Sequence, residues 1–137
     1  VLSRQFGLLQ KESSQCCGIT AVQSHILYEI KSNHHMSINE LAEKLGLDNS
    51  TTSRHVQGLV EKELVERLPD PNDRRYVTLA LSKKGEQLES EITRMMTEYI
   101  LDITQQLPDN KVHVIAEALT DLTEAMKKSN YCCRPPF

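Results

Sequence analysis

The sequence predicts a mainly α-helical fold that contains one small β-hairpin, and two observations support this. Apolar residues recur at helical spacing along most of the 137 residues, which indicates amphipathic helices. The exception is segment 64–81, where two short apolar runs flank the sequence PDPNDRR, a turn-rich stretch typical of a long hairpin tip. With 39% hydrophobic and 26% charged residues, residues 1–137 are expected to form a single globular domain.

Two helices are predicted before residue 37. The first is short and is indicated by the spacing of Leu2, Phe6 and Leu9. Thr20 stands in the N-cap position of the second helix, which ends at the sequence KSNHH. The apolar stripe of this second helix consists of Val22, Ile26, Leu27 and Ile30. Each helix is therefore expected to bury one face.

A short helix, a tight turn and another helix come next. Ser37 and Glu40 have the spacing of a capping box, and Gly46 ends the short helix. The following helix begins in the sequence NSTTSRHVQGL, residues 49–59. Its predicted buried positions are Thr52, Val56, Leu59 and Val60. The hydroxyl and amide side chains at its start are poor choices for a helix interior, so they need another explanation.

Residues 64–68 and 76–81 are predicted to form the strands of the hairpin. In the second strand, Val77, Leu79 and Leu81 alternate with Tyr76, Thr78 and Ala80. Such alternation is typical of a strand that buries one face.

Two long helices follow the hairpin. Ser82 caps the first, and the sequence Leu107-Pro108 breaks the chain before the second. Their apolar stripes are Leu88, Ile92, Met95, Met96, Tyr99 and Ile103, and then Val112, Ile115, Leu119, Leu122 and Met126. These stripes are too long for the small central module to cover. We therefore expect residues 1–33 and 83–130 to be dimerisation helices that pack against a second copy, with an irregular tail at 131–137.

Residues 37–82 have the element order of a winged helix-turn-helix lobe. In such a lobe the second helix enters the DNA major groove with its N-terminal residues foremost. Short polar side chains and free helix N–H groups suit phosphates there, while Arg and Gln suit guanine and adenine. The candidate DNA-binding residues of this helix are Asn49, Ser50, Thr51, Ser53, Arg54 and Gln57. The alternative is a solvated helix whose hydroxyl groups serve only as caps.

The predicted hairpin tip carries Asp73, Arg74 and Arg75. Two cations on a projecting turn suit the DNA minor groove, where the negative potential is enhanced over narrow A·T tracts. Asp73 is placed to pair with Arg75 and to hold its guanidinium in position. An ordinary charged turn is the alternative.

The charge distribution limits how this lobe can bind DNA. The net charge of −3 argues against a general affinity for nucleic acid or anionic membranes. Between residues 37 and 85, eight basic residues balance eight acidic ones. Binding must then depend on a few placed cations, and we expect a modest affinity that weakens as the salt concentration rises.

Segment 37–85, and most specifically the sequence DPNDRRYVTLALSKKG within it, resembles the MarR family of bacterial and archaeal transcription regulators. The resemblance implies an obligate homodimer with interlocked terminal helices, which reads a palindromic operator in double-stranded DNA. Repression of neighbouring genes is the expected role. The resemblance also implies that the helix residues from Ser50 to Gln57 named above face the major groove, with Asp73 and Arg75 at the wing tip.

Two positions depart from the family pattern. Thr52 stands where an aliphatic residue is common, so slightly weaker helix packing is expected. Glu63 precedes Leu64 at a place where glycine is usual. If this residue adopts the left-handed conformation, glutamate costs about 1 kcal/mol relative to glycine.

Regulators similar to this sequence typically respond to a small ligand, to cysteine oxidation or to a metal. The candidate thiol residues form two adjacent pairs, Cys16 with Cys17 and Cys132 with Cys133. Clustered thiolates suit soft metals, and they also form regulatory disulfides on oxidation. Neither pair has the C-x-x-C spacing of a zinc or redox site, and inert cysteines are the alternative. No cofactor is expected to be required, and no metal site is assigned.

Two other function classes are consistent with the sequence. One is a winged-helix module that binds protein and has lost DNA binding, and the other is a thiol-based protein that binds a metal or metalloid. Catalysis is not expected, because no general base, phosphate loop or nucleophile constellation accompanies the cysteines. No apolar run approaches the length of a membrane span, and the first residues lack a signal-peptide pattern. We therefore expect a cytoplasmic protein without a membrane partner.

Overall fold

The computed structural model describes residues 18–33, 35–70, 73 and 75–128. The chain falls into two compact units, Val1–Met95 and Met96–Phe137. The predicted helix at residues 2–9 and the tail at 131–137 lie outside the described residues.

Helix α2, Ala21–Ser32, has the predicted N-cap. The Thr20 hydroxyl accepts a hydrogen bond from the Gln23 N–H at 3.2 Å, and the Gln23 side chain accepts one in return from the Thr20 N–H at 3.1 Å. The helix ends at Asn33, where the chain becomes extended. This reciprocal capping satisfies two N–H groups that the first helical turn leaves without partners.

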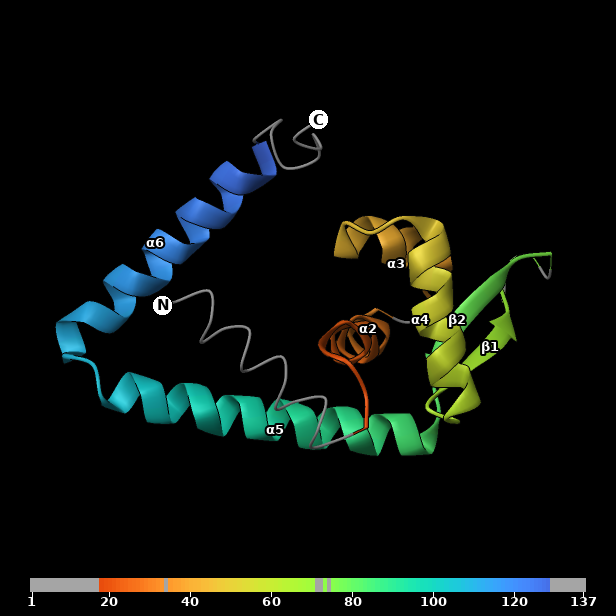
Figure 1. The fold of residues 1–137 in the computed structure, drawn as a ribbon, viewed down its shortest axis with the longest axis horizontal. Helices are drawn as coiled ribbons and strands as arrows, with labels where there is room; N and C mark the ends of the chain where they lie inside the picture. The colour runs from red at the N-terminus through yellow and green to blue at the C-terminus, as the bar shows by residue number, and fades with distance from the viewer. Residues whose placement is uncertain (1–17, 34, 71–72, 74, 129–137) are drawn as a thin grey trace. The chain divides into compact units, whose positions relative to one another are not determined.

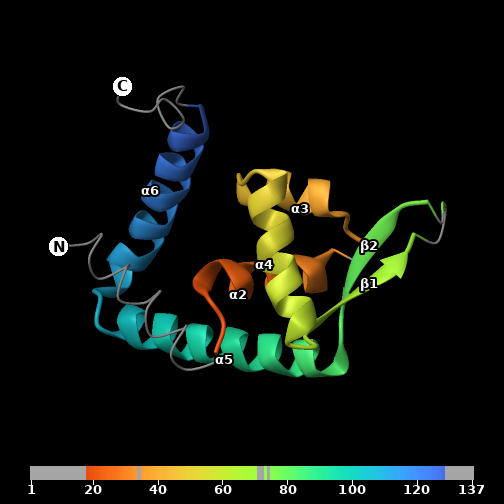
Figure 2. The same cartoon turned by 45° about the vertical axis from the view of Figure 1, so that its right-hand side comes forward.

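Helices α3, Ile38–Leu45, and α4, Asn49–Glu61, form the helix-turn-helix. The predicted capping box of Ser37 and Glu40 is present, and Gly46 ends α3 in the left-handed conformation with φ of 65°. Helix α3 packs against α4, and α2 packs against both (Figures 1 and 2). The sequence therefore predicted this part of the fold correctly.

The core of the first unit is aliphatic and lies where these helices meet the hairpin. Its fully buried side chains are Ile26, Leu27, Leu41, Thr52, Val56, Leu59, Val65 and Leu79. The Thr52 hydroxyl donates to the Asp48 carbonyl at 3.0 Å, so the polar atom that replaces the usual aliphatic group has a partner. A buried hydroxyl with a partner avoids most of the desolvation cost.

The hairpin consists of β1, Val65–Pro69, and β2, Val77–Leu81, paired antiparallel with Val65 opposite Leu81. Both strands begin one residue later than predicted. The Leu64 N–H is bonded to the Leu59 carbonyl at the end of α4, and the Tyr76 N–H is bonded to the Asp73 carbonyl in the turn. Because each N–H already serves a turn, the ladder starts at the next residue.

The predicted alternation along the second strand is only partly present. Val77 is 49% exposed, whereas Thr78 and Leu79 are both buried. The Thr78 hydroxyl donates to the Leu68 carbonyl at 3.4 Å, and the Leu79 N–H donates to the Met36 carbonyl at 2.8 Å. The hairpin extends away from the end of α4 (Figure 1), and Val77, which pairs with Pro69 toward the tip, lies outside the core.

A tight turn at Glu63 connects α4 to β1. The Glu63 N–H donates to the Val60 carbonyl, and the Leu64 N–H to the Leu59 carbonyl, both at 2.9 Å. This is the pattern of a Schellman motif, in which the residue after the cap is left-handed. Glu63 has φ of 60°, so the conformation that glycine favours is present at this glutamate.

Helix α5, Lys83–Gln105, begins against that turn. The Ser82 hydroxyl donates to the Glu63 carbonyl at 2.6 Å and accepts from the Gly85 N–H at 3.0 Å. Further along, the carboxylate of Glu89 is only 5% exposed and pairs with Lys31 of α2. The first turns of α5 are therefore attached to both α4 and α2.

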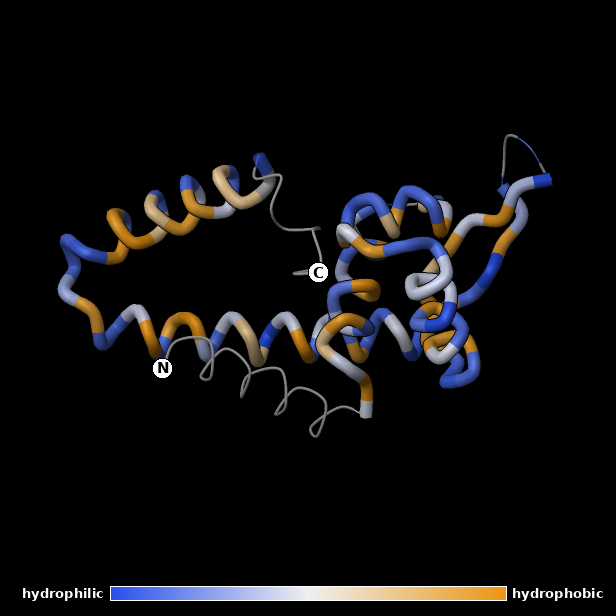
Figure 3. Tube along the Cα trace, turned by 45° about the horizontal axis from the view of Figure 1, so that its top comes forward, coloured by the Kyte–Doolittle hydropathy of each residue, from blue (hydrophilic) through white to orange (hydrophobic). Residues whose placement is uncertain are grey.

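The second unit contains the end of α5 and helix α6, Asp109–Lys128, which starts after the predicted break at Pro108. Hydrophobic positions recur along both helices (Figure 3). Many of these side chains are exposed in the single chain, among them Tyr99, Ile100, Leu101, Val114, Leu119, Leu122 and Met126. None of the helices that the structure describes is long and apolar enough to span a membrane.

Replacing Glu63 with glycine is expected to stabilise the first unit. Glycine adopts φ near 60° without the Cβ strain that glutamate carries, and this relief exceeds the added chain entropy of the unfolded state. The free energy of unfolding, measured by urea denaturation, should rise by about 1 kcal/mol. A lower value for the Glu63→Gly variant would contradict the assignment of strain to this turn.

Replacing Gly85 with alanine is expected to destabilise the same unit by roughly 3 kcal/mol, because overpacking against backbone cannot be relieved by a rotamer change. A Cβ at Gly85 would lie 2.0 Å from the Leu64 carbonyl oxygen. Gly58→Ala is the matched control, since its Cβ would meet only the end of the Gln23 side chain, at 3.0 Å. Urea denaturation should separate the two variants, and equal stabilities would refute this reading of the contact.

Candidate nucleic-acid interface

The start of α4 is organised by Asp48, an exposed N-cap residue that the sequence prediction did not include. One carboxylate oxygen accepts from the Thr51 N–H at 2.8 Å and from the Ser50 hydroxyl at 2.5 Å. The other accepts from the Thr51 hydroxyl at 2.7 Å. The hydroxyls of Ser50 and Thr51, together with the Thr51 N–H, hold the pKa of Asp48 well below its usual range. An aspartate directly before the helix, three residues ahead of a threonine, was the signal that could have revealed this cap.

Two of the predicted DNA-binding hydroxyls therefore donate to Asp48 in this structure. Ser50 is exposed and Thr51 is half-buried, and each hydroxyl oxygen keeps its remaining capacity as an acceptor. Asn49 is exposed and Ser53 is half-buried. The polar start of the helix thus serves as a cap and also presents oxygen atoms to solvent. The contact of these residues with DNA stays a prediction.

Arg54 and Gln57 follow Ser50 at spacings of four and seven residues, which places the three on one face of α4. Thr52, Val56 and Leu59 occupy the buried face. Gln57 donates to the Glu61 carboxylate at 3.1 Å. Arg54 is exposed, and within the described ranges its guanidinium has no hydrogen-bond or ion-pair partner. It is therefore free to engage an external acceptor.

The wing tip confirms the predicted pairing of Asp73 with Arg75. The Arg75 side chain donates from Nε to the two carboxylate oxygens at 3.0 and 3.1 Å, and from Nη2 to Oδ2 at 2.6 Å. The hydrogen bonds from Arg75 lower the pKa of Asp73, and the carboxylate raises the pKa of Arg75. Arg74 lies outside the described residues. The pair orients an exposed guanidinium at the tip, because a two-point contact restricts its rotation.

Backbone contacts fix the turn that carries this pair. The Asp70 N–H donates to the Tyr76 carbonyl at 2.9 Å, and the Tyr76 N–H to the Asp73 carbonyl at 3.0 Å. The Asp73 N–H donates to the Asp70 carboxylate at 3.1 Å. The position of Arg75 therefore depends on the backbone of the turn as well as on its ion pair.

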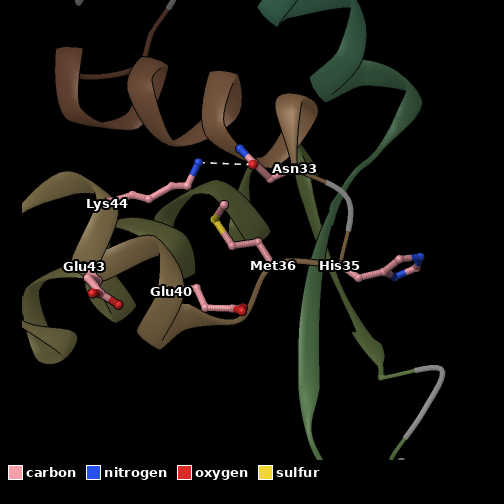
Figure 4. Close-up of a pocket in the computed structure, with 6 residues that line it drawn as sticks. All are labelled: Asn33, His35, Met36, Glu40, Glu43 and Lys44. Atoms are coloured by element: carbon pink, nitrogen blue, oxygen red, sulfur yellow. Dashed lines mark hydrogen bonds between the residues drawn. The ribbon is translucent and has the colours of Figure 1, made fainter.

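A pocket of about 420 Å³ lies at the end of α2 and beside α3. Its lining residues are Asn33, His35, Met36, Glu40, Glu43 and Lys44. Lys44 donates to the Asn33 side chain at 3.1 Å (Figure 4) and also pairs with Glu29 at 3.2 Å. Neither α4 nor the hairpin lines this pocket, so it is separate from the face formed by Arg54 and Gln57.

The candidate thiol residues, Cys16, Cys17, Cys132 and Cys133, lie outside the described residues. Among the residues that are described, no group of three or more His, Cys, Asp or Glu side chains is placed to hold a metal ion. The thiol hypothesis therefore stays a prediction.

Comparison with known proteins identifies the family. The MarR family model matches residues 19–77. The HTH-type transcriptional regulator YsmB of Bacillus subtilis strain 168 is 34% identical over 102 residues, which cover 74% of this chain and 68% of YsmB. The chain belongs to the MarR family of transcriptional regulators.

Other MarR-like proteins support the assignment. The HTH-type transcriptional repressor MdtR of B. subtilis is 26% identical over 127 residues, covering 87% of this chain and 82% of MdtR. The structure of Streptococcus pneumoniae FabT in complex with DNA has a TM-score of 0.82 and covers 92% of each chain, at 21% sequence identity. At that identity the likeness concerns the fold, and it confirms the predicted winged helix-turn-helix class for this MarR-family chain.

The Asp73–Arg75 pair can be tested by titration. In the Arg75→Ala variant the pKa of Asp73 should rise toward its ordinary value, because the hydrogen bonds that favour the carboxylate are lost. As the pH falls, Asp73 should then take up its proton at a higher pH than in the parent protein. Carbon NMR of the side-chain carboxyl groups measures this shift. Glu40, whose pKa is lowered by its hydrogen bonds with Ser37, is the control that should not move; an unchanged Asp73 would argue against the pair.

Proposed function

We propose that this chain is a homodimeric, sequence-specific DNA-binding regulator that represses neighbouring genes. In this proposal α4 enters the major groove of a palindromic operator with Ser50, Arg54 and Gln57 toward the DNA. Asn49, Thr51 and Ser53 also face the DNA, and the wing carries Asp73, Arg74 and Arg75 to the minor groove. The supporting observation is an uncommitted guanidinium on α4 together with an oriented guanidinium at the wing tip, in a winged helix-turn-helix lobe.

The state of Arg54 favours DNA as its partner. An exposed arginine in the second turn of a recognition helix can donate two parallel hydrogen bonds to guanine O6 and N7. No described residue engages this guanidinium, so binding a base edge breaks no internal contact. The Gln57 amide already donates one N–H to Glu61, so only its second N–H and its Oε1 are left for a base. Arg54 is therefore the stronger candidate for base readout.

Arg75 has a different role in the proposal. Asp73 accepts from Nε and from one N–H of Nη2, so the two N–H groups of Nη1 and the second N–H of Nη2 are left for DNA. A guanidinium held in this way loses less side-chain entropy on entering a narrow minor groove. The Asp73 carboxylate offsets part of the positive charge of Arg75. The contact with DNA then depends more on the orientation of the guanidinium than on its net charge.

Similar proteins support both parts of the proposal. FabT, whose structure contains DNA, has the same fold, and MdtR is named as a repressor. A regulator of this kind acts where the DNA is, which favours the cytoplasm. A free Arg54 and an oriented Arg75 favour DNA binding over the alternative of a winged-helix module that binds only protein.

Dimerisation through residues 1–33 and 83–130 is proposed because of the exposed apolar side chains of α5 and α6. Monomeric proteins rarely leave such extended apolar surface open to water. A second copy of the chain offers the same stripe, and a two-fold axis would allow each stripe to cover the other. Two lobes related by that axis would match the two halves of a palindrome.

Control of DNA binding by an effector belongs to the same proposal. A small ligand would release the protein from the operator. Alternatively, oxidation or binding of a soft metal would do so at the cysteines Cys16, Cys17, Cys132 and Cys133. The chemistry of adjacent thiols supports this proposal.

Removing either guanidinium is expected to weaken DNA binding. Arg54→Ala should lose about 1–3 kcal/mol, or roughly five- to 150-fold in affinity, because a bidentate base contact is absent. Arg75→Ala should weaken the gel shift strongly while the oligomeric state is retained. The measurement is an electrophoretic shift with the region upstream of the protein's own gene, repeated at several salt concentrations.

Lys111→Ala on α6 is the matched control, since it removes one exposed cation outside the lobe. It should bind DNA like the parent protein. Equal losses in all three variants would point to a general charge effect and would overturn the assigned roles. Binding that does not weaken with salt would contradict a contact based on a few placed cations.

A further inference from the structure

We propose that Asp48 limits the affinity of the recognition helix for DNA phosphates and so suppresses sequence-independent binding. This inference rests on the proposed DNA-binding function and adds a residue that works against binding. Asp48 occupies the donors that a phosphate would otherwise use at the start of α4.

The hydrogen bonds at the start of α4 carry the inference. Three donors converge on the Asp48 carboxylate, namely the hydroxyls of Ser50 and Thr51 and the Thr51 N–H. These are the group types that bind phosphate at helix N-termini. While they serve Asp48, a phosphate that approaches the same point meets a carboxylate and no free donor among the three.

The charge of Asp48 adds to this effect. The hydrogen bonds from Ser50 and Thr51 keep the pKa of Asp48 low, so the side chain stays an anion throughout the neutral pH range. An anion at a helix N-terminus is favourable for the helix itself, because it interacts with the positive end of the dipole. The same residue therefore stabilises α4 and repels the DNA backbone.

Because the charge of the lobe is balanced, the single carboxylate of Asp48 has a measurable effect on the affinity for DNA. Residues 37–85 carry eight basic and eight acidic side chains, so no excess of cations hides the contribution of Asp48. Phosphate contacts are the main source of non-specific affinity. The Asp48 carboxylate at the start of α4 lowers that non-specific affinity. The choice of binding site then depends more on base contacts such as that of Arg54.

The first test replaces Asp48 with asparagine and, separately, with serine. Both residues are good N-caps, so thermal unfolding should show that α4 is retained. Glu91→Gln is the matched control, because Glu91 is an exposed carboxylate on α5 without a hydrogen-bond or ion-pair partner in the described part of the chain. Binding is measured by fluorescence anisotropy with an operator selected from a random pool and with a duplex of unselected sequence.

Both neutral variants should bind the unselected duplex roughly fivefold more tightly per protomer, the effect of removing one unit charge about 4 Å from a phosphate in water. The dependence of log affinity on log salt should steepen by up to about one for each protomer. The affinity for the operator should rise by no more than the affinity for the unselected duplex. The ratio of the two affinities should therefore fall or stay the same. Glu91→Gln should match the parent protein on both duplexes.

The second test is a double-mutant cycle with Thr51→Val. The amide introduced by Asp48→Asn has a single oxygen acceptor, so in that variant the Thr51 hydroxyl loses its acceptor and becomes available to DNA. Thr51→Val should therefore reduce affinity severalfold more in the Asp48→Asn background than in the parent protein. Equal effects of Thr51→Val in the two backgrounds would overturn the proposal.

The remaining outcomes separate this inference from the proposed function. If the parent protein binds the operator and the Asp48 variants bind neither duplex more tightly than Glu91→Gln does, Asp48 does not limit phosphate binding. An increase in affinity for the operator alone would also overturn the inference, because it would mean that Asp48 acts on a base contact and not on phosphates. If neither the parent protein nor any variant binds either duplex, the proposed DNA-binding function itself fails.

Discussion

The arrangement of this lobe depends on a close backbone contact between the end of α4 and the start of α5. The Leu64 carbonyl accepts from the Ser82 N–H at 3.1 Å, and Gly85 lies directly against the same carbonyl. The Ser82 hydroxyl and the Lys84 side chain bond to the carbonyls of Glu63 and Lys62. Both strands of the wing join this junction, so it fixes where the wing lies relative to α4.

Carboxylates orient most of the polar side chains on the candidate interface. Asp73 holds Arg75, Glu61 holds Gln57, and Asp48 holds the hydroxyls of Ser50 and Thr51. Each such contact reduces the side-chain entropy that is lost on binding, but it also engages donors that DNA would use. In a lobe without net charge, pre-oriented donors favour ligands whose acceptors match their geometry, and general electrostatic attraction contributes less.

The parts of the fold that were predictable from the sequence depend on neighbours along the chain. Caps at Thr20 and Ser37, the stop at Gly46 and the buried stripe of α4 are local features, and they were placed correctly. The strand boundaries were off by one residue, since Leu64 and Tyr76 first complete turns. The ion pair of Glu89 with Lys31 joins residues 58 positions apart, and no spacing rule reveals such a pair. Asp48 was missed for a different reason: Asn49, Ser50 and Thr51 are also good N-cap residue types, so residue type alone does not place the cap.

The paired Glu89 and Lys31 constrain how this sequence can change during evolution. The carboxylate is almost fully buried and also accepts from the Thr93 hydroxyl at 2.6 Å. Loss of Lys31 alone would leave a buried charge without a counter-ion, which is costly, whereas joint replacement by two apolar residues is often neutral. The two positions are therefore expected to change together or not at all among close relatives, which would leave a signature of covariation between α2 and α5.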